Sequence, residues 1–284
     1  MPPDWKFFEK LSNILFVRRL MNPVWNECGD VEHDRWSSLR LFLLGYAFER
    51  QGRSPDYAPA AVDTIDEIRN EPLCAAMAAT AWNRFAEKLN NEGLNHANNP
   101  MCPRGTLYNG RYRGRQVERR TTRKLSAVEF AAQLEQPLVA WARDLVRNGH
   151  VAEAHEQLCT IRGVDVKIAP LFLRDVVLWY NLAPENDLHL LHPVDTWVEF
   201  VVRKLSRNAG MTPASCANYI VEHANAPERA NQGMWYFCVH VAGSSRYVVR
   251  RCLEDDVRCN AALDRHLANL SAGGAAAAEW NGQQ

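Results

Sequence analysis

The sequence predicts an all-α fold, on the basis of three observations. Apolar side chains recur at helical spacing in residues 39–50, 73–89, 139–146 and 248–270. Alternating β-branched patterns, which are typical of strands, are scarce. Residues 212–213 and 225–228 read Thr-Pro and Asn-Ala-Pro-Glu, and a capping side chain near a first-turn proline is typical of a helix start. We therefore expect helices to form most of the core.

Length and composition limit the class of protein. A chain of 284 residues is long enough for one large domain or two packed lobes. Hydrophobic residues make up 47% of it, yet no apolar run approaches the roughly 20 residues that span a membrane. Residues 1–4 begin no signal-peptide pattern, so we expect a cytoplasmic protein with no membrane partner. The cysteines include no Cys-x-x-Cys pair, so we expect no metal site.

One long segment interrupts the helical pattern. Residues 90–124 are rich in Asn, Gly, Pro and Arg, and a loop of this length is usually functional or mobile. The whole chain has 33 basic and 33 acidic residues, whereas positions 104–124 hold eight basic residues and one acid, Glu118. We expect residues 95–124 to form a basic loop that contacts nucleic acid, the alternative being a solvated flexible segment. Residues 271–284 are expected to form a flexible tail.

Residues 151–180 contain the most informative pattern. They predict a helix over 151–161, a tight turn over 162–166 and a second helix over 167–180. Gly163 leaves the backbone of the turn free of side-chain hindrance. The first amides of the second helix would point at whatever approaches them, which suits an anionic phosphate.

The same segment resembles a known motif. Residues 161–169 read Ile-Arg-Gly-Val-Asp-Val-Lys-Ile-Ala, and residues 193–198 read Pro-Val-Asp-Thr-Trp-Val. The corresponding family patterns are Leu-Pro-Gly-Val-Gly-x-Lys-x-Ala and, downstream, Val-Asp-Thr-His-Val. The chain thus resembles the helix-hairpin-helix DNA glycosylases, in their lysine-containing branch, over about residues 151–205. These enzymes flip a base out of the duplex and cut it from its sugar.

The resemblance implies two catalytic residues. Lys167 falls on the lysine nucleophile of glycosylases that are also lyases, and Asp195 falls on the essential aspartate of the superfamily. Three positions depart from the pattern, because Arg162 replaces Pro, Asp165 replaces Gly and Trp197 replaces His. Asp165 weakens the phosphate-binding interpretation. The interval between Lys167 and Asp195 is also longer than usual in the family, which suggests an insertion over residues 182–192.

The chemistry explains why these residue types are needed. Cleavage of the glycosidic bond builds positive charge on the sugar, which an ionised Asp195 would stabilise. A lysine attacks carbon only when neutral, and roughly one in a few thousand is neutral at pH 7. We therefore expect Lys167 to lie in an apolar pocket that lowers its pKa, so that it can form a Schiff base with the sugar. An N-cap for Asp195 and a solvent-exposed lysine are the structural alternatives.

Further residues are candidates for contact with DNA or with the flipped base. Leu171, Arg174 and Asp175 follow Lys167 by four, seven and eight residues and share its helix face. They are pocket candidates, with a structural ion pair between neighbouring helices as the alternative for Arg174 and Asp175. The candidate DNA-binding residues are those of the turn and of the basic loop: Gly163, Val164, Asp165, Val166, Arg111, Arg113, Arg115, Arg119 and Arg120.

The resemblance also implies a domain organisation. We expect a bilobal helix-hairpin-helix glycosylase fold, with the active site in the cleft between the lobes. Residues 1–69 and 193–270 would form one helical lobe. Residues 70–192 would form a central bundle that carries the hairpin. No metal or organic cofactor is implied.

Several functions remain compatible with this sequence. The resemblance implies a monomeric DNA glycosylase, with or without lyase activity, that acts on double-stranded DNA bearing a damaged or modified base and associates with the nucleoid when bound. It would serve base-excision repair or antiviral defence against phages with modified DNA. The alternatives are a catalytically silent DNA-binding module and a phage-type enzyme that processes modified thymine. The sequence does not identify the base.

Overall fold

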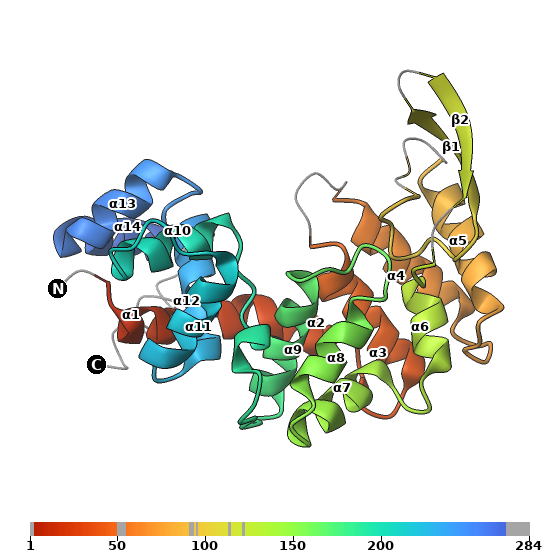
Figure 1. The fold of residues 1–284 in the computed structure, drawn as a ribbon, viewed down its shortest axis with the longest axis horizontal. Coiled ribbons are helices and arrows are strands. Elements are labelled where there is room, and N and C mark those ends of the chain that lie inside the picture. Colours follow the sequence, from red (N-terminus) through yellow and green to blue (C-terminus); the bar gives the residue numbers. More distant parts are fainter. Residues whose placement is uncertain are drawn as a thin grey trace. The chain divides into compact units, whose positions relative to one another are not determined.

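The protein is mostly helical (Figure 1). This computed structural model describes residues 3–49, 55–90, 94, 96–112, 115–120 and 123–270, with the backbone alone for 109–112 and 115–120. The chain divides into two compact units. We call Val24–Asn186 the central unit, and Met1–Pro23 together with Asp187–Gln284 the terminal unit. Within the described residues, no helix has both the length and the apolar character to cross a membrane.

The central unit contains the predicted hairpin and the basic segment. Its helices are α2 (Asn22–Glu27, which starts at the boundary), α3 (Arg35–Phe42), the π-helical turn η2 (Leu43–Ala47), α4 (Tyr57–Ile68), α5 (Met77–Lys88), α6 (Ala127–Gln133), α7 (Leu138–Arg147), α8 (Val151–Leu158) and α9 (Ile168–Trp179). Helices α7, α8 and α9 pack against one another (Figure 1). Helix α9 also packs on η2.

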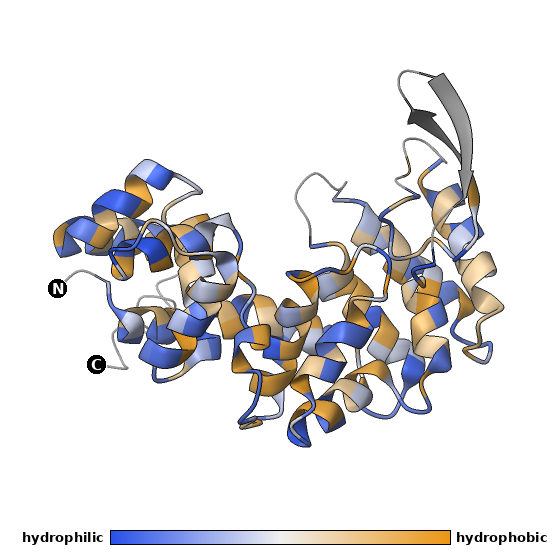
Figure 2. Ribbon diagram, in the orientation of Figure 1, coloured by the Kyte–Doolittle hydropathy of each residue, from blue (hydrophilic) through white to orange (hydrophobic). Residues whose placement is uncertain are grey.

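Helix α9, the second helix of the predicted hairpin, is deeply buried. It is hydrophobic along most of its length (Figure 2), and its buried side chains include Phe172, Leu173, Val176 and Val177. The Phe172 ring packs edge-on against Phe42 and Tyr46, with ring centroids 5.2 and 5.1 Å apart. Burial of this aromatic surface holds α9 in the core. The N-terminal end of α9, next to the predicted turn, is therefore fixed in position within the unit.

The basic segment forms a β-hairpin that the helical pattern did not predict. Strand β1 (Leu107–Tyr112) pairs antiparallel with β2 (Arg115–Arg120). The two strands extend beyond the helices of the central unit (Figure 1). Its sequence lacks the alternating hydrophobic pattern by which a half-buried strand is recognised. We call β1 and β2 together the basic ribbon.

The terminal unit is built around one helix. Its elements are α1 (Trp5–Leu11), the π-helical segment η1 (Ser12–Met21), the 3₁₀ turn η3 (Leu188–Leu191), α10 (Thr196–Leu205), α11 (Pro213–His223), α12 (Pro227–Tyr236), the π-helical turn η4 (Phe237–Val241), α13 (Arg246–Glu254) and α14 (Asp256–Leu270). Helix α12 packs against α1, η1, α10 and α11. Gly233 permits the close approach of α1, because a Cβ at that position would overlap the backbone carbonyl of Phe8.

The boundaries of the units differ from those expected. The sequence placed residues 24–69 with the C-terminal helices, whereas in the structure they belong to the central unit. Helix α3 packs on α6 and α7, and α4 packs on α5, which joins this segment to the helices that follow it. The expected flexible tail, residues 271–284, lies outside the described residues.

Candidate functional site

The predicted hairpin is present as α8, a turn and α9. Gly163 has φ +76°, in the left-handed region that glycine adopts without strain, so the chain can reverse there. The turn is held from outside by a short parallel bridge between Leu125 and Ile161. In this bridge the amide of Leu125 donates to the carbonyl of Thr160 at 3.1 Å, and the amide of Arg162 donates to the carbonyl of Leu125 at 2.7 Å.

Asp165 occupies the start of α9 with its own carboxylate. Its Oδ1 accepts hydrogen bonds from the amides of Lys167 at 3.0 Å and Ile168 at 3.4 Å. An aspartate in this position satisfies the first amides of a helix and stabilises it. These two amides are the donors that a phosphate would have used, and the carboxylate would repel that phosphate. The turn of this chain is therefore self-capped, and its first amides already have a carboxylate partner.

The other turn residues divide between buried and exposed. Val164 is fully buried, whereas Val166 is 70% exposed. Lys167 immediately precedes α9 and is exposed, so it does not lie in the apolar pocket that the sequence analysis expected. The Nζ of Lys124 approaches the Val164 carbonyl at 3.4 Å, which places a second cation beside the turn.

Arg162 is the residue at this turn whose role the sequence did not reveal. It is 1% exposed, and its guanidinium donates to the carbonyls of Cys102 at 3.1 Å, Ala97 at 3.4 Å and Lys124 at 2.8 Å. These carbonyls lie before β1 and after β2. Arg162 thus ties both ends of the basic ribbon to the hairpin turn. The available signal was that Arg162 stands where the motif that the sequence resembles has proline.

Arg174 and Asp175 form a buried ion pair. Their side chains are 2% and 5% exposed, and Nη2 of Arg174 lies 2.8 Å from Oδ1 of Asp175. Tyr46 donates to Oδ2 of Asp175 at 3.2 Å and accepts from the Trp25 indole at 2.7 Å. Burial, followed by the charge of Asp175, raises the pKa of the Tyr46 phenol well above its usual range. These contacts fit a structural ion pair, which here joins two residues of α9 itself. Leu171, the third pocket candidate, lies on the same helix and is half-buried.

The arginines of the basic loop are distributed along the ribbon. Arg111 lies in β1, and Arg115, Arg119 and Arg120 lie in β2. Arg113 lies outside the described residues. The structure therefore places four of the five predicted arginines on one regular element.

Asp195 stands at the start of α10 in the terminal unit. It is half-buried, and its Oδ1 accepts from the amides of Trp197 and Val198, both at 2.9 Å. The N-cap interpretation is thus confirmed, and it leaves room for a catalytic role of the same carboxylate. Lys167 belongs to the central unit, so the two predicted catalytic residues belong to different units.

Two buried residues behind Asp195 were not predicted. Asn231 is 0% exposed, and its amide donates to the Pro193 carbonyl at 3.0 Å, which holds the chain two residues before Asp195. Cys238 is also 0% exposed. Burial, and then the neighbouring charge of Asp195, raises the pKa of its thiol far above the usual range. The sequence signal was the polar pair Asn231-Gln232 directly before the apolar end of α12.

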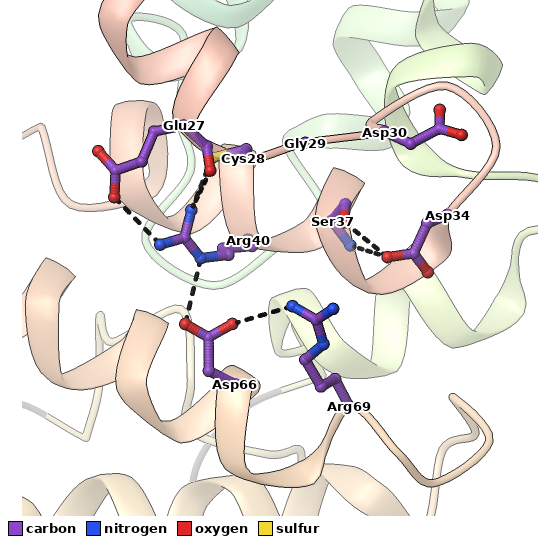
Figure 3. Close-up of a pocket in the computed structure, with 9 residues that line it drawn as sticks. All are labelled: Glu27, Cys28, Gly29, Asp30, Asp34, Ser37, Arg40, Asp66 and Arg69. Carbon is purple, nitrogen blue, oxygen red and sulfur yellow. Dashed lines mark hydrogen bonds and ion pairs between the residues drawn. The ribbon is translucent and has the colours of Figure 1, made fainter.

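A pocket in the central unit lies at residues that the sequence analysis did not select (Figure 3). Its volume is about 430 Å³. The charged residues that line it are four acids and two arginines: Glu27, Asp30, Asp34, Asp66, Arg40 and Arg69. Arg40 bonds to Glu27 at 3.0 Å and to Asp66 at 3.3 Å, and Asp66 also pairs with Arg69 at 3.7 Å. This acidic excess would repel a DNA strand, so the pocket does not suit a flipped nucleotide.

Across the described residues, no three His, Cys, Asp or Glu side chains lie together as a metal site requires.

Comparisons with known proteins add one partial likeness. No protein-family model matches the chain, and no solved structure matches it. The chain is 40% identical over 75 residues to an uncharacterized protein of Methanocaldococcus jannaschii. The match covers 26% of this chain and 17% of that protein, so it is a likeness of one segment.

Proposed function

We propose that this protein is a DNA glycosylase that removes a damaged or enzymatically modified base from double-stranded DNA. The observation that carries the proposal is the chain order of two helix starts. Lys167 immediately precedes α9 of the hairpin, and Asp195 immediately precedes and caps α10. These are the places that the lysine and the aspartate occupy in the motif that the sequence resembles.

Asp195 is the residue with the better support. Two backbone amides and the Asn231-bound loop fix the place of its carboxylate, and it is half-buried. A carboxylate fixed in advance stabilises developing positive charge on a sugar without a cost of reorganisation. Excision of the base is therefore the activity that we assign first.

The lyase step depends on Lys167, whose exposure sets a condition. An amine in water at pH 7 is almost entirely protonated and does not attack carbon. Bound DNA would have to exclude water from Lys167 before a Schiff base could form. We therefore assign excision without strand cleavage as the main activity, and the lyase step as the conditional one.

The test is an excision assay with matched variants. Wild-type protein is incubated with duplexes that each carry one oxidised, alkylated or bulky modified base, and alkali then cuts the strand at abasic sites. Asp195→Asn, which keeps a capping side chain, should reduce excision by about 10²-fold or more, the effect of losing one preorganised electrostatic group. Lys167→Gln should leave excision within a few-fold and abolish borohydride trapping. Absence of cleavage across the whole panel would contradict the proposal.

A binding module without catalysis is the second candidate, and the exposure of Lys167 favours it. In that case the protein would bind duplexes, excise nothing, and show equal affinity in wild-type and Lys167→Gln forms. The same panel separates the two functions, because binding and excision are measured on the same duplexes.

A further inference from the structure

The register of the basic ribbon separates its residues into two faces of different chemistry. Directly paired positions of an antiparallel ladder share a face, and successive positions alternate between faces. The pairs 108/119, 110/117 and 112/115 form one face, with Tyr108, Gly110, Tyr112, Arg115, Val117 and Arg119. The pairs 107/120, 109/118 and 111/116 form the other face, with Leu107, Asn109, Arg111, Gln116, Glu118 and Arg120. We call the second the polar face.

The polar face carries the residue types that read DNA bases. In the major groove, arginine pairs with guanine, asparagine and glutamine with adenine, and glutamate accepts from cytosine, while an apolar side chain contacts the thymine methyl. Arg111 and Arg120, Asn109 and Gln116, and Glu118 supply all three polar classes, and Leu107 supplies the apolar contact. The opposite face holds two tyrosines, a valine and a glycine in addition to two arginines.

The root of the ribbon shows which face is available. The Tyr108 ring stacks on His96, with centroids 5.1 Å apart and planes 4° apart. His96 in turn packs edge-on against Trp82 of α5 at 5.1 Å. The Tyr108 face is therefore covered at its root by the body of the central unit. Leu107, at the root of the polar face, is 50% exposed.

Size and charge favour a B-form duplex as the partner. Two paired strands lie about 4.8 Å apart, and six residues span about 20 Å. A two-stranded ribbon of these dimensions fits the major groove, which is about 12 Å wide. Positions 104–124 carry eight basic residues and one acid, a net charge of +7, so in a chain of net charge 0 the remainder carries −7. Phosphates are therefore attracted to this segment and repelled by the rest.

From the register, the covered face and the charge together, we propose that the basic ribbon is a DNA-reading arm whose polar face enters the major groove of double-stranded DNA. Arg162 connects this arm to the hairpin turn, because its guanidinium donates hydrogen bonds to backbone carbonyls before β1 and after β2. Since Asp165 already occupies the first amides of α9, the ribbon takes over the phosphate attraction that the turn has lost. The arm would give the protein a preference for certain base sequences around its target.

The first test compares two double variants that remove the same charge. Arg111→Gln/Arg120→Gln changes the polar face, and Arg115→Gln/Arg119→Gln changes the opposite face. Affinity is measured by fluorescence anisotropy on an unmodified duplex selected from a random pool. The polar-face variant should lose about 100-fold, because two base contacts worth about tenfold each are removed. The opposite-face variant should lose only a few-fold. Equal losses would overturn the assignment of faces.

The second test removes base reading without changing charge. Asn109→Ala/Gln116→Ala should leave affinity for random duplexes within about twofold, yet lower the preference for the selected duplex by about tenfold or more, because two base contacts are lost while those of Arg111 and Arg120 remain. An RNA duplex of the same sequence should bind at least tenfold more weakly than DNA, because its major groove is too deep and narrow for the ribbon. Equal binding of the two duplexes, or no sequence preference in the wild type, would overturn the proposal. Circular dichroism verifies the fold of each variant.

This inference does not require base excision. It concerns binding of unmodified duplexes, so excision can fail while the ribbon binds, or succeed without any sequence preference.

Discussion

Two aspartates in different units of the molecule make the same local contact in different surroundings. Asp165 caps α9 in the central unit and Asp195 caps α10 in the terminal unit. Each accepts from the amides two and three residues further on. Beside Asp165, however, the buried Arg162 holds three carbonyls of the ribbon segment. Beside Asp195, the buried Asn231 holds the backbone of the Asp195 loop itself.

This difference shows that a capping aspartate does not define a functional site. At the hairpin, the buried Arg162 binds the segments on either side of the basic ribbon. The end of the turn, at Val166 and Lys167, stays exposed. At α10, the buried Asn231 binds the backbone of the loop that leads to Asp195. Preorganisation of a carboxylate comes from such support, so Asp195 is the better catalytic candidate of the two.

The largest expected effect concerns the support at the hairpin. Arg162→Leu leaves three backbone carbonyls without their donor in a buried site, so we expect a loss of about 3–5 kcal/mol in the free energy of unfolding. Urea unfolding followed by circular dichroism measures it. Arg123→Leu, in the same segment, is the control and should cost less than about 0.5 kcal/mol. A loss below about 1 kcal/mol for Arg162→Leu would refute its role as the mount of the ribbon.

A smaller loss is expected at the support of Asp195. Asn231→Leu is similar in volume but leaves the Pro193 carbonyl unsatisfied, so it should cost about 1–3 kcal/mol in the free energy of unfolding. It should also reduce any excision activity under conditions where the variant is still folded, because the Asp195 loop loses its tether. If Asn231→Leu retained full excision activity, the idea of a preorganised Asp195 would be wrong.

Loss of either capping aspartate should lower the free energy of unfolding by a similar amount, but the two losses should affect function differently. Asp165→Ala and Asp195→Ala should each lose about 1 kcal/mol, whereas the Asn replacements should lose little, because asparagine caps as well as aspartate. Asp165→Asn removes a negative charge beside the hairpin and should strengthen DNA binding by a few-fold at low salt. Asp195→Asn should instead reduce excision by about 10²-fold or more and leave DNA affinity nearly unchanged. Equal functional effects of the two Asn variants would remove the distinction between the caps.

The smallest expected effect is a pH dependence from His266 in the terminal unit. His266 bonds to the Tyr236 hydroxyl at 2.9 Å, and burial, followed by the nearby His240 and Arg19, lowers the pKa of His266. The folded state therefore favours the neutral ring. The stability that this contributes is present above the unfolded pKa of about 6.5 and is lost as pH falls through the lower folded pKa.

Thermal unfolding between pH 8 and pH 5 tests this dependence. The melting temperature should fall on acidification, and His266→Gln should flatten the part of the profile below pH 6.5. A melting temperature that rises on acidification in the wild type, or an identical profile in the variant, would contradict the expected sign.

Much of the fold followed from local chemistry. Helical periodicity predicted α5 and α7 approximately, whereas the stretch 39–50 covers the end of α3 together with η2, and the stretch 248–270 is divided between α13 and α14. Thr212 caps the helix that begins at Pro213 as expected. The turn at Gly163 was also predicted, because a left-handed residue between two amphipathic helices leaves few alternatives. The basic ribbon was missed, since its sequence carries no alternating apolar pattern with a period of two.

The candidate site was predictable only in its residue types. The sequence by itself determined that Asp195 stands at a helix start, since a capping side chain needs only the next three amides of its own chain. Tertiary structure alone decided that Arg162 is buried against three carbonyls, that the Arg174–Asp175 ion pair is buried, and that Asn231 holds the Asp195 loop. Each of these depends on partners from distant segments, or on the depth of burial, neither of which leaves a pattern in neighbouring residues.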